Sequence, residues 1–244
     1  MKVLSIGNSF SEDAHRWLHK LAVMNGVYME CVNLYIGGCS LGRHWKGYVE
    51  NNEYYSFEVN GNKGEKKVTL CEALESDTWD VITLQQASPS SGKPQSYFPY
   101  LQKLADVVRE KQPTAKLYFL QTWSYERDAT LSAFDKYDRN QHEMFRRIVD
   151  ASEMVARVID VPVIPSGTVI QRLRDEVEDF DRDRGGIPLT RDGYHLSLDY
   201  GRFASAATVF CKLTDQRIDI EYFEDFDTDR LKKIIEIAES VVFG

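Results

Sequence analysis

The chain lacks several features that would place a protein in a class at once. Its 244 residues include only four cysteines, at positions 31, 39, 71 and 211, and no C-x-x-C pair. This spacing argues against a zinc site and a disulfide framework, and is typical of buried thiols in a reducing compartment. We therefore expect no metal and no disulfide.

A basic excess and a long apolar run are also missing. The chain has 30 Lys and Arg against 38 Asp and Glu, a net charge of −8. A nucleic-acid backbone requires a basic face, and a membrane span requires about 20 apolar residues, so we expect neither partner. Strand-like sequence begins at Val3 and no signal peptide is apparent, which predicts a cytoplasmic location.

Strand-like and helix-like stretches alternate through most of the sequence. This order predicts βαβ units, a parallel sheet covered on both faces, and one α/β domain over residues 1–244. The expected strands are 2–6, 28–35, 80–85, 116–121 and 161–164, and the expected helices are 11–25, 97–112, 138–159, 199–213 and 227–242.

One segment, YYSFEVNGNKGEKKVTL at 54–70, breaks this alternation. It has two β-rich runs around Asn60-Gly61-Asn62, which is a hairpin signal. We expect the hairpin to be an excursion from the core or a decoration at the edge of the sheet.

A serine directly follows the first expected strand. Ser9 comes after Gly7-Asn8, and helical spacing begins at Glu12. Ser9 can cap this helix, the interpretation that the stretch alone favours, or it can be a nucleophile beside backbone N–H groups that stabilise an oxyanion. The crevice of such sheets lies beyond the carboxyl ends of the strands, where Ser9 is expected.

A carboxylate and a histidine stand three residues apart near the other end of the chain. In LTRDGYHLSLDYGR, Asp192 can accept a hydrogen bond from Nδ1–H of His195 and leave the other ring nitrogen for a nucleophile. A D-x-x-H match by itself is weak. The alternative is a surface aspartate in a turn and a half-buried histidine.

As an ordered set, these segments resemble the SGNH, or GDSL-like, hydrolases. The similarity runs from about residue 2 to about residue 213 and is closest to a branch catalogued mainly as a domain of unknown function. It implies a three-layer α/β/α sandwich of the flavodoxin-like SGNH type. The lipase-type G-x-S-x-G elbow is absent. The segments are IGNSFS, IGGCS, WDVITLQQAS, QTWSY, PSGTVIQ and LTRDGYHLS.

The resemblance also implies roles for individual residues. Ser9 would be the nucleophile, His195 the general base and later acid, and Asp192 the residue that orients His195. The backbone N–H groups of Ser9 and Gly38 would face the oxyanion, with Gly37 as the second choice in place of Gly38.

The chain departs from the family pattern at the third oxyanion donor. The family usually has an asparagine after the third strand, whereas this chain has Gln85-Gln86. A glutamine amide can donate the same hydrogen bond, and strand alternation lets only one of the two reach the site. We expect Gln86, and less so Gln85.

Three further residues are candidates for contact with substrate. Trp123 and Tyr125 are aromatics near the expected crevice, although packing is the commoner fate of tryptophan. Arg191 is placed to meet an anionic group, or to pair with acids of its own loop.

These features predict a serine esterase that needs no cofactor. It would hydrolyse a carboxylic ester, by family analogy an acetyl ester on a small molecule or carbohydrate, through an acyl-enzyme. An O-acyltransferase with the same triad is one alternative, and a ligand-binding protein that has lost turnover is another.

Overall fold

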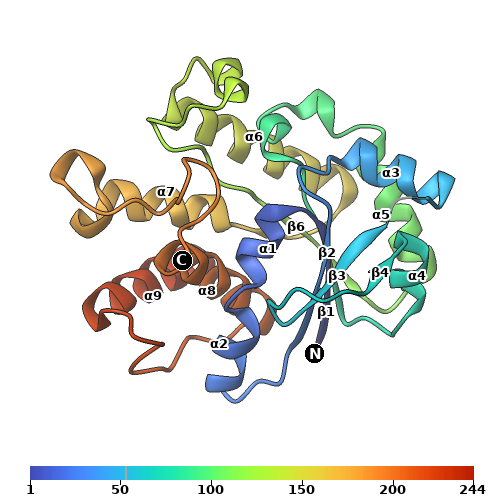
Figure 1. The fold of residues 1–244 in the computed structure, drawn as a ribbon, viewed down its shortest axis with the longest axis horizontal. Coiled ribbons are helices and arrows are strands. Elements are labelled where there is room, and N and C mark those ends of the chain that lie inside the picture. Colours follow the sequence, from blue (N-terminus) through green and yellow to red (C-terminus); the bar gives the residue numbers. More distant parts are fainter. Residues whose placement is uncertain (53) are drawn as a thin grey trace.

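The computed structural model describes residues 1–52 and 54–244. These residues contain a seven-stranded sheet in the order β4-β3-β2-β1-β5-β6-β7 (Figure 1). Strands β2, β1, β5, β6 and β7 run parallel to one another, and β3 and β4 are antiparallel additions at one edge. The strands are β1 Lys2–Gly7, β2 Glu30–Tyr35, β3 Tyr55–Val59, β4 Lys67–Val68, β5 Val81–Leu84, β6 Lys116–Leu120 and β7 Val163–Ile164.

Helices cover both faces of this sheet. They are α1 Ser9–His15, α2 Leu18–Met24, α3 Leu41–Glu50, α4 Leu70–Glu75, α5 Tyr100–Lys111, α6 Gln141–Ile159, α7 Ser166–Glu176, α8 Tyr200–Thr214 and α9 Thr228–Phe243.

Each face of the sheet supports its own apolar core because side chains alternate along the strands. On β1, Val3 belongs to one core, whereas Leu4 and Ile6 belong to the other. Helices α1, α2, α7, α8 and α9 pack on the first face, and α3, α4, α5 and much of α6 on the second (Figure 1). The predicted three-layer α/β/α sandwich is therefore confirmed.

The helices differ from the sequence expectations in two respects. The stretch 11–25 forms two helices, since α1 ends at His15 and α2 begins at Leu18. Helices α3, α4 and α7 are not predicted. Gly42 and Gly47 in α3 and Gly167 in α7 each weaken a helical pattern by about 1 kcal/mol, and α4 has only six residues.

The hairpin at 54–70 joins the sheet. Strand β3 pairs antiparallel with β2, in the register Val32 to Val59, and β4 pairs with β3. The hairpin is therefore an edge extension of the sheet and not an excursion away from it.

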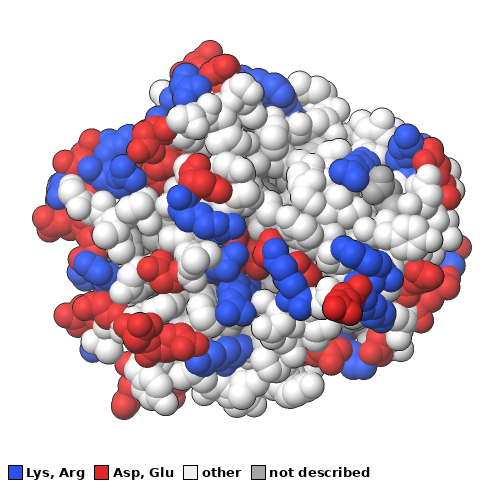
Figure 2. All heavy atoms as spheres, viewed as in Figure 1, with Lys and Arg blue, Asp and Glu red and all other residues white. Residues whose placement is uncertain are grey.

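Charged side chains of both signs are interspersed over the face of the molecule seen in Figure 2. None of the helices in residues 1–52 and 54–244 is both long and apolar enough to cross a membrane.

Candidate active site

The turn after β1 presents Ser9 as the first residue of helix α1. Asn8 is the N-cap: its side chain accepts a hydrogen bond of 3.0 Å from the backbone N–H of Phe10. The Ser11 hydroxyl accepts one from the N–H of Asn8, which completes a capping box. The capping interpretation of Ser9 is therefore wrong, because Asn8 and Ser11 already cap the helix.

Glycine is required at position 7 by this tight turn. A Cβ atom there would lie 2.1 Å from Ser11 Oγ and 3.3 Å from Gln85 Cδ. The backbone at Gly7, between β1 and α1, therefore lies close to the side chains of Ser11 and Gln85, which hold the N-cap of α1.

Ser9, His195 and Asp192 lie in one hydrogen-bonded line. His195 Nε2 is 2.8 Å from Ser9 Oγ, and His195 Nδ1 is 2.6 Å from Asp192 Oδ2. The first distance joins residues 186 positions apart in the chain. A hydroxyl, an imidazole and a carboxylate in this order can transfer a proton from the hydroxyl to the imidazole while the carboxylate fixes the tautomer.

The loop that carries Asp192 and His195 is held by its own backbone. Asp192 Oδ1 accepts hydrogen bonds from the N–H groups of His195, at 2.7 Å, and Tyr194, at 3.2 Å. Burial opposes ionisation of Asp192, but these bonds and the one to the His195 ring outweigh it and hold the pKa of the carboxyl below its usual value. Asp192 is therefore a carboxylate at neutral pH.

A cavity of about 310 Å³ opens beside Ser9. Its walls come from the turn after β1, the loop after β2, the loop after β5 and the loops around 125–131 and 194–195. The lining residues are Asn8, Ser9, Phe10, Tyr35, Gly37, Gly38, Ser88, Pro89, Tyr125, Leu131, Tyr194 and His195.

Backbone N–H groups are available at two places on this wall. Ser9 is the first residue of α1, and the N–H of such a residue has no partner within its helix. The N–H of Gly38 donates to no acceptor in the part of the chain that the structure describes. Gly38 has φ +62°, a conformation that favours glycine, and both Gly37 and Gly38 line the cavity.

The two glutamines after β5 do not line this cavity. The amide nitrogen of Gln86 donates to the backbone oxygen of Ser96 at 3.0 Å and to its Oγ at 3.2 Å. Its Oε1 accepts from the backbone N–H groups of Leu41 and Ala87. These contacts contradict the expectation that Gln86 donates to an oxyanion. Its polar atoms instead bond groups of three other residues of the chain, Leu41, Ala87 and Ser96.

Gln85 has a different structural contact. Its Nε2 donates to Asn8 Oδ1 at 2.7 Å, and Asn8 Nδ2 donates in turn to the backbone oxygen of Cys39. Gln85 thus holds Asn8, the N-cap of α1, in place. Gln85, the second choice for the oxyanion donor, therefore also lies outside the cavity.

The three candidate substrate contacts are placed differently from one another. Trp123 is fully buried, stacks on Phe10 with ring centroids 4.4 Å apart, and donates from Nε1 to the Tyr194 oxygen. Trp123 therefore packs beneath the site and does not line it. Tyr125, in contrast, is a wall of the cavity.

Arg191 does not line the Ser9 cavity either. Its Nη1 donates to both carboxylate oxygens of Asp13, at 3.0 and 3.2 Å, and to the backbone oxygen of Leu196. The expectation of a substrate contact is wrong for this residue, because a buried carboxylate on α1 holds its guanidinium.

Several lining residues are not predicted from the sequence. The ring of Tyr194 lies against His195, with centroids 4.0 Å apart, and its other neighbour is Tyr125 at 6.0 Å. Tyr35 is the last residue of β2 and Ser88 lies in the loop after β5, so the strand-end rule that indicates Ser9 could have found them too.

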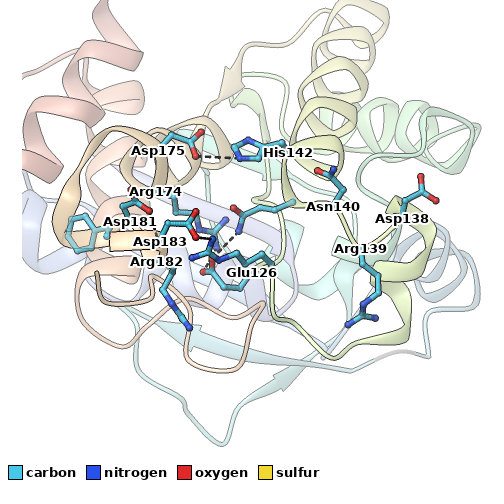
Figure 3. Close-up of a pocket in the computed structure, with 13 residues that line it drawn as sticks. Glu126, Asp138, Arg139, Asn140, His142, Arg174, Asp175, Asp181, Arg182 and Asp183 are labelled. Atoms are coloured by element: carbon cyan, nitrogen blue, oxygen red, sulfur yellow. Dashed lines mark hydrogen bonds and ion pairs between the residues drawn. The ribbon is translucent and has the colours of Figure 1, made fainter. Parts of the chain in front are cut away.

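A second, larger cavity of about 400 Å³ shares no lining residue with the Ser9 cavity (Figure 3). Its charged side chains are largely paired with one another. Arg174 bonds Glu126 at 3.0 Å, and His142 lies 3.8 Å from Asp175. This cavity is therefore separate from the candidate triad.

Comparisons with known proteins agree with this architecture. The model of the family described as "Domain of unknown function (DUF4886)" matches residues 2–236. A crystal structure of a DUF4886 protein from Bacteroides uniformis has 38% identity and a TM-score of 0.90, with 99% of this chain and 94% of that one covered.

Two more distant structures share the fold. A protein from Slackia heliotrinireducens, described as a candidate SGNH hydrolase, has 18% identity and a TM-score of 0.59 over 86% of this chain and 97% of that one. A mutant of an acetyl-xylooligosaccharide esterase from Geobacillus has 11% identity and a TM-score of 0.51 over 92% of this chain and 97% of that one. No curated protein matches the chain. The chain belongs to the DUF4886 family and has the fold of the SGNH hydrolases.

Proposed function

We propose that this protein is a serine esterase whose nucleophile is Ser9. The observation that carries the proposal is the line of two short hydrogen bonds, 2.8 Å from Ser9 Oγ to His195 Nε2 and 2.6 Å from His195 Nδ1 to Asp192. A serine that only caps a helix needs no histidine, and here Asn8 is the cap.

The reaction follows from this arrangement. Ser9 Oγ attacks the ester carbonyl while His195 takes its proton, and the backbone N–H groups of Ser9 and Gly38 face the negative oxygen that forms. His195 then gives the proton to the departing alcohol, which leaves an acyl group on Ser9. Water, deprotonated by His195, attacks the acyl group and releases the acid and free Ser9.

The size of the cavity favours a compact ester. About 310 Å³ is at the lower end of small-molecule sites, and its walls include the rings of Tyr35, Tyr125 and Tyr194. A short acyl group such as acetyl, on a small alcohol or a sugar whose ring contacts these aromatics, is the substrate class that we propose. The acetyl-xylooligosaccharide esterase that shares the fold supports this choice by analogy.

Hydrolysis of p-nitrophenyl acetate by the wild type and by Ser9→Ala tests the proposal. We expect release of p-nitrophenol by the wild type and its loss in the variant, whose fold is checked by circular dichroism. A fluorophosphonate probe should label the wild type and not Ser9→Ala. Equal rates in both proteins, with no labelling of either, would contradict the esterase. Faster product formation on addition of a second alcohol would instead favour an acyltransferase with the same triad.

A further inference from the structure

The proposed esterase site has a pair of buried hydroxyl groups in its wall. Ser88 Oγ and Tyr125 OH are 3.0 Å apart, and both residues line the cavity beside Ser9. Tyr125 is fully buried and Ser88 nearly so. Neither residue belongs to the triad, and their pairing brings together the loop after β5 and the segment after β6.

One hydrogen of this pair has no acceptor within the described chain. Two hydroxyls carry two hydrogens, and their mutual bond uses only one of them. No other acceptor for either hydroxyl exists among residues 1–52 and 54–244. Because both residues line the cavity, the second hydrogen can be donated to an oxygen atom of a bound molecule.

A chain of ring contacts links the pair to the triad. The Tyr125 ring contacts the Tyr194 ring, with centroids 6.0 Å apart, and Tyr194 contacts the His195 ring at 4.0 Å. Burial raises the pKa of Tyr125 to about 12, against the opposing effect of its hydrogen bond with Ser88, so the phenol keeps its proton at neutral pH.

From these contacts we infer that the Ser88–Tyr125 hydroxyl pair supplies the third hydrogen bond to the oxyanion. It takes the place of the Gln86 side-chain amide, which in this chain bonds Ser96 instead. The inference rests on the proposed esterase function. The amide of Gln86 is committed to Ser96, and Gln85 lies outside the cavity, whereas Ser88 stands two residues further along the same loop. The pair would act as a relay in which one hydroxyl donates to the other and the second donates to the oxyanion.

The decisive variant is Ser88→Ala/Tyr125→Phe, because it removes both hydroxyls of the relay. We expect kcat for p-nitrophenyl acetate to fall about 100-fold with KM little changed, because the bond forms only as charge develops on the oxygen. The matched control is Ser166→Ala/Ser205→Ala. It removes a pair of buried hydroxyls, 3.2 Å apart between α7 and α8, that does not line the cavity. The control should keep the wild-type kcat.

Binding of methylboronic acid gives a second readout. Ser9 Oγ adds to boron, His195 takes the proton, and the tetrahedral boronate that results resembles the charged intermediate. The double variant should bind it about 100-fold more weakly, and the control as tightly as the wild type. If the double variant does not fold, at least one single variant must lose about tenfold in boronate affinity.

Two results would overturn the inference while leaving the esterase in place. One is wild-type kcat and boronate affinity in the double variant or in both single variants. The other is a rise in KM with unchanged kcat, which would make the pair a contact to the ground-state substrate. Failure of the esterase itself has a different signature, the absence of Ser9-dependent turnover and labelling in the wild type, and would overturn both proposals.

Discussion

Asp13 Oδ2 accepts a hydrogen bond of 2.8 Å from the backbone N–H of Leu196, the residue that follows His195. Asp13 lies on α1, about one turn after Ser9. The helix that presents the Ser9 hydroxyl therefore also holds the loop that presents His195. Arg202 Nε donates to Asp13 Oδ1 at 2.7 Å and, with Arg191, gives the fully buried carboxylate its counter-charge.

Replacement of Asp13 by asparagine should destabilise the fold and slow the reaction. The variant leaves two guanidinium groups near a buried site without their carboxylate, which typically costs about 3–5 kcal/mol of the free energy of unfolding. Urea unfolding measures this loss of free energy. The kcat at pH 7, measured without urea, shows whether His195 is displaced. Asp150→Asn, an exposed carboxylate on α6, is the control and should change the free energy of unfolding by less than about 1 kcal/mol. An Asp13→Asn variant as stable as the wild type would refute the role of this contact.

Asp192→Asn should lower kcat on the order of 10³- to 10⁴-fold with little effect on folding. The asparagine amide can present a donor to His195 Nδ1 and so favours the wrong tautomer, in which Nε2 carries the proton and cannot accept the one from Ser9. Initial rates with p-nitrophenyl acetate measure the effect, and thermal unfolding checks the fold. A fall of less than about tenfold would mean that Asp192 does not orient the base.

The stability of the protein should depend on the protonation of Glu58. This carboxyl on β3 is 3% exposed; its Oε2 accepts from Asn33 Nδ2, and its Oε1 has no partner among the described residues. Burial raises its pKa to about 6 from 4.5, although the hydrogen bond from Asn33 opposes the shift.

The sign of this pH dependence follows from the raised pKa. The contribution of neutral Glu58 is fully present below pH 4.5 and is lost as the pH rises through about 6, because the unfolded chain ionises first. The loss is about 2 kcal/mol of the free energy of unfolding by pH 7. In Glu58→Gln this component of the pH dependence should vanish, as measured by urea unfolding between pH 4.5 and 7. Glu65→Gln, an exposed position on the same hairpin, should keep the wild-type profile, and an unchanged profile in Glu58→Gln would exclude the effect.

Gln86→Ala separates a structural role from a catalytic one. Removal of Oε1 leaves the buried N–H groups of Leu41 and Ala87 without an acceptor, so we expect a loss of about 1–3 kcal/mol in the free energy of unfolding. The folded variant should lose much less than the 100-fold in kcat that removal of an oxyanion donor causes. Parallel measurement of thermal unfolding and of kcat below the unfolding transition tests this. A 100-fold loss of kcat at unchanged stability would restore Gln86 as a donor.

Local patterns were sufficient for the layered arrangement of strands and helices, whereas the roles of the triad candidates were implied by the resemblance to the SGNH hydrolases. Alternation along β1 and β2 follows from the geometry of a strand, and the parallel order follows from strands that alternate with helices. A serine at a strand end and a D-x-x-H pair are visible because each depends on neighbours in sequence.

Residue patterns along the chain therefore predict the layered sheet, the strand-end position of Ser9 and the spacing of Asp192 from His195, because all three depend on local backbone geometry. Which side chains reach the cavity depends instead on how the loops pack in three dimensions. Gln86 turns to Ser96, Arg191 turns to Asp13, Trp123 packs under Phe10, and Tyr125 reaches the wall. Each of these outcomes depends on which loop packs against which, because a long polar or aromatic side chain adopts the rotamer whose partners are nearest in space. Contacts across 186 residues, such as Ser9 to His195, exist only after the sheet has brought its strand ends together.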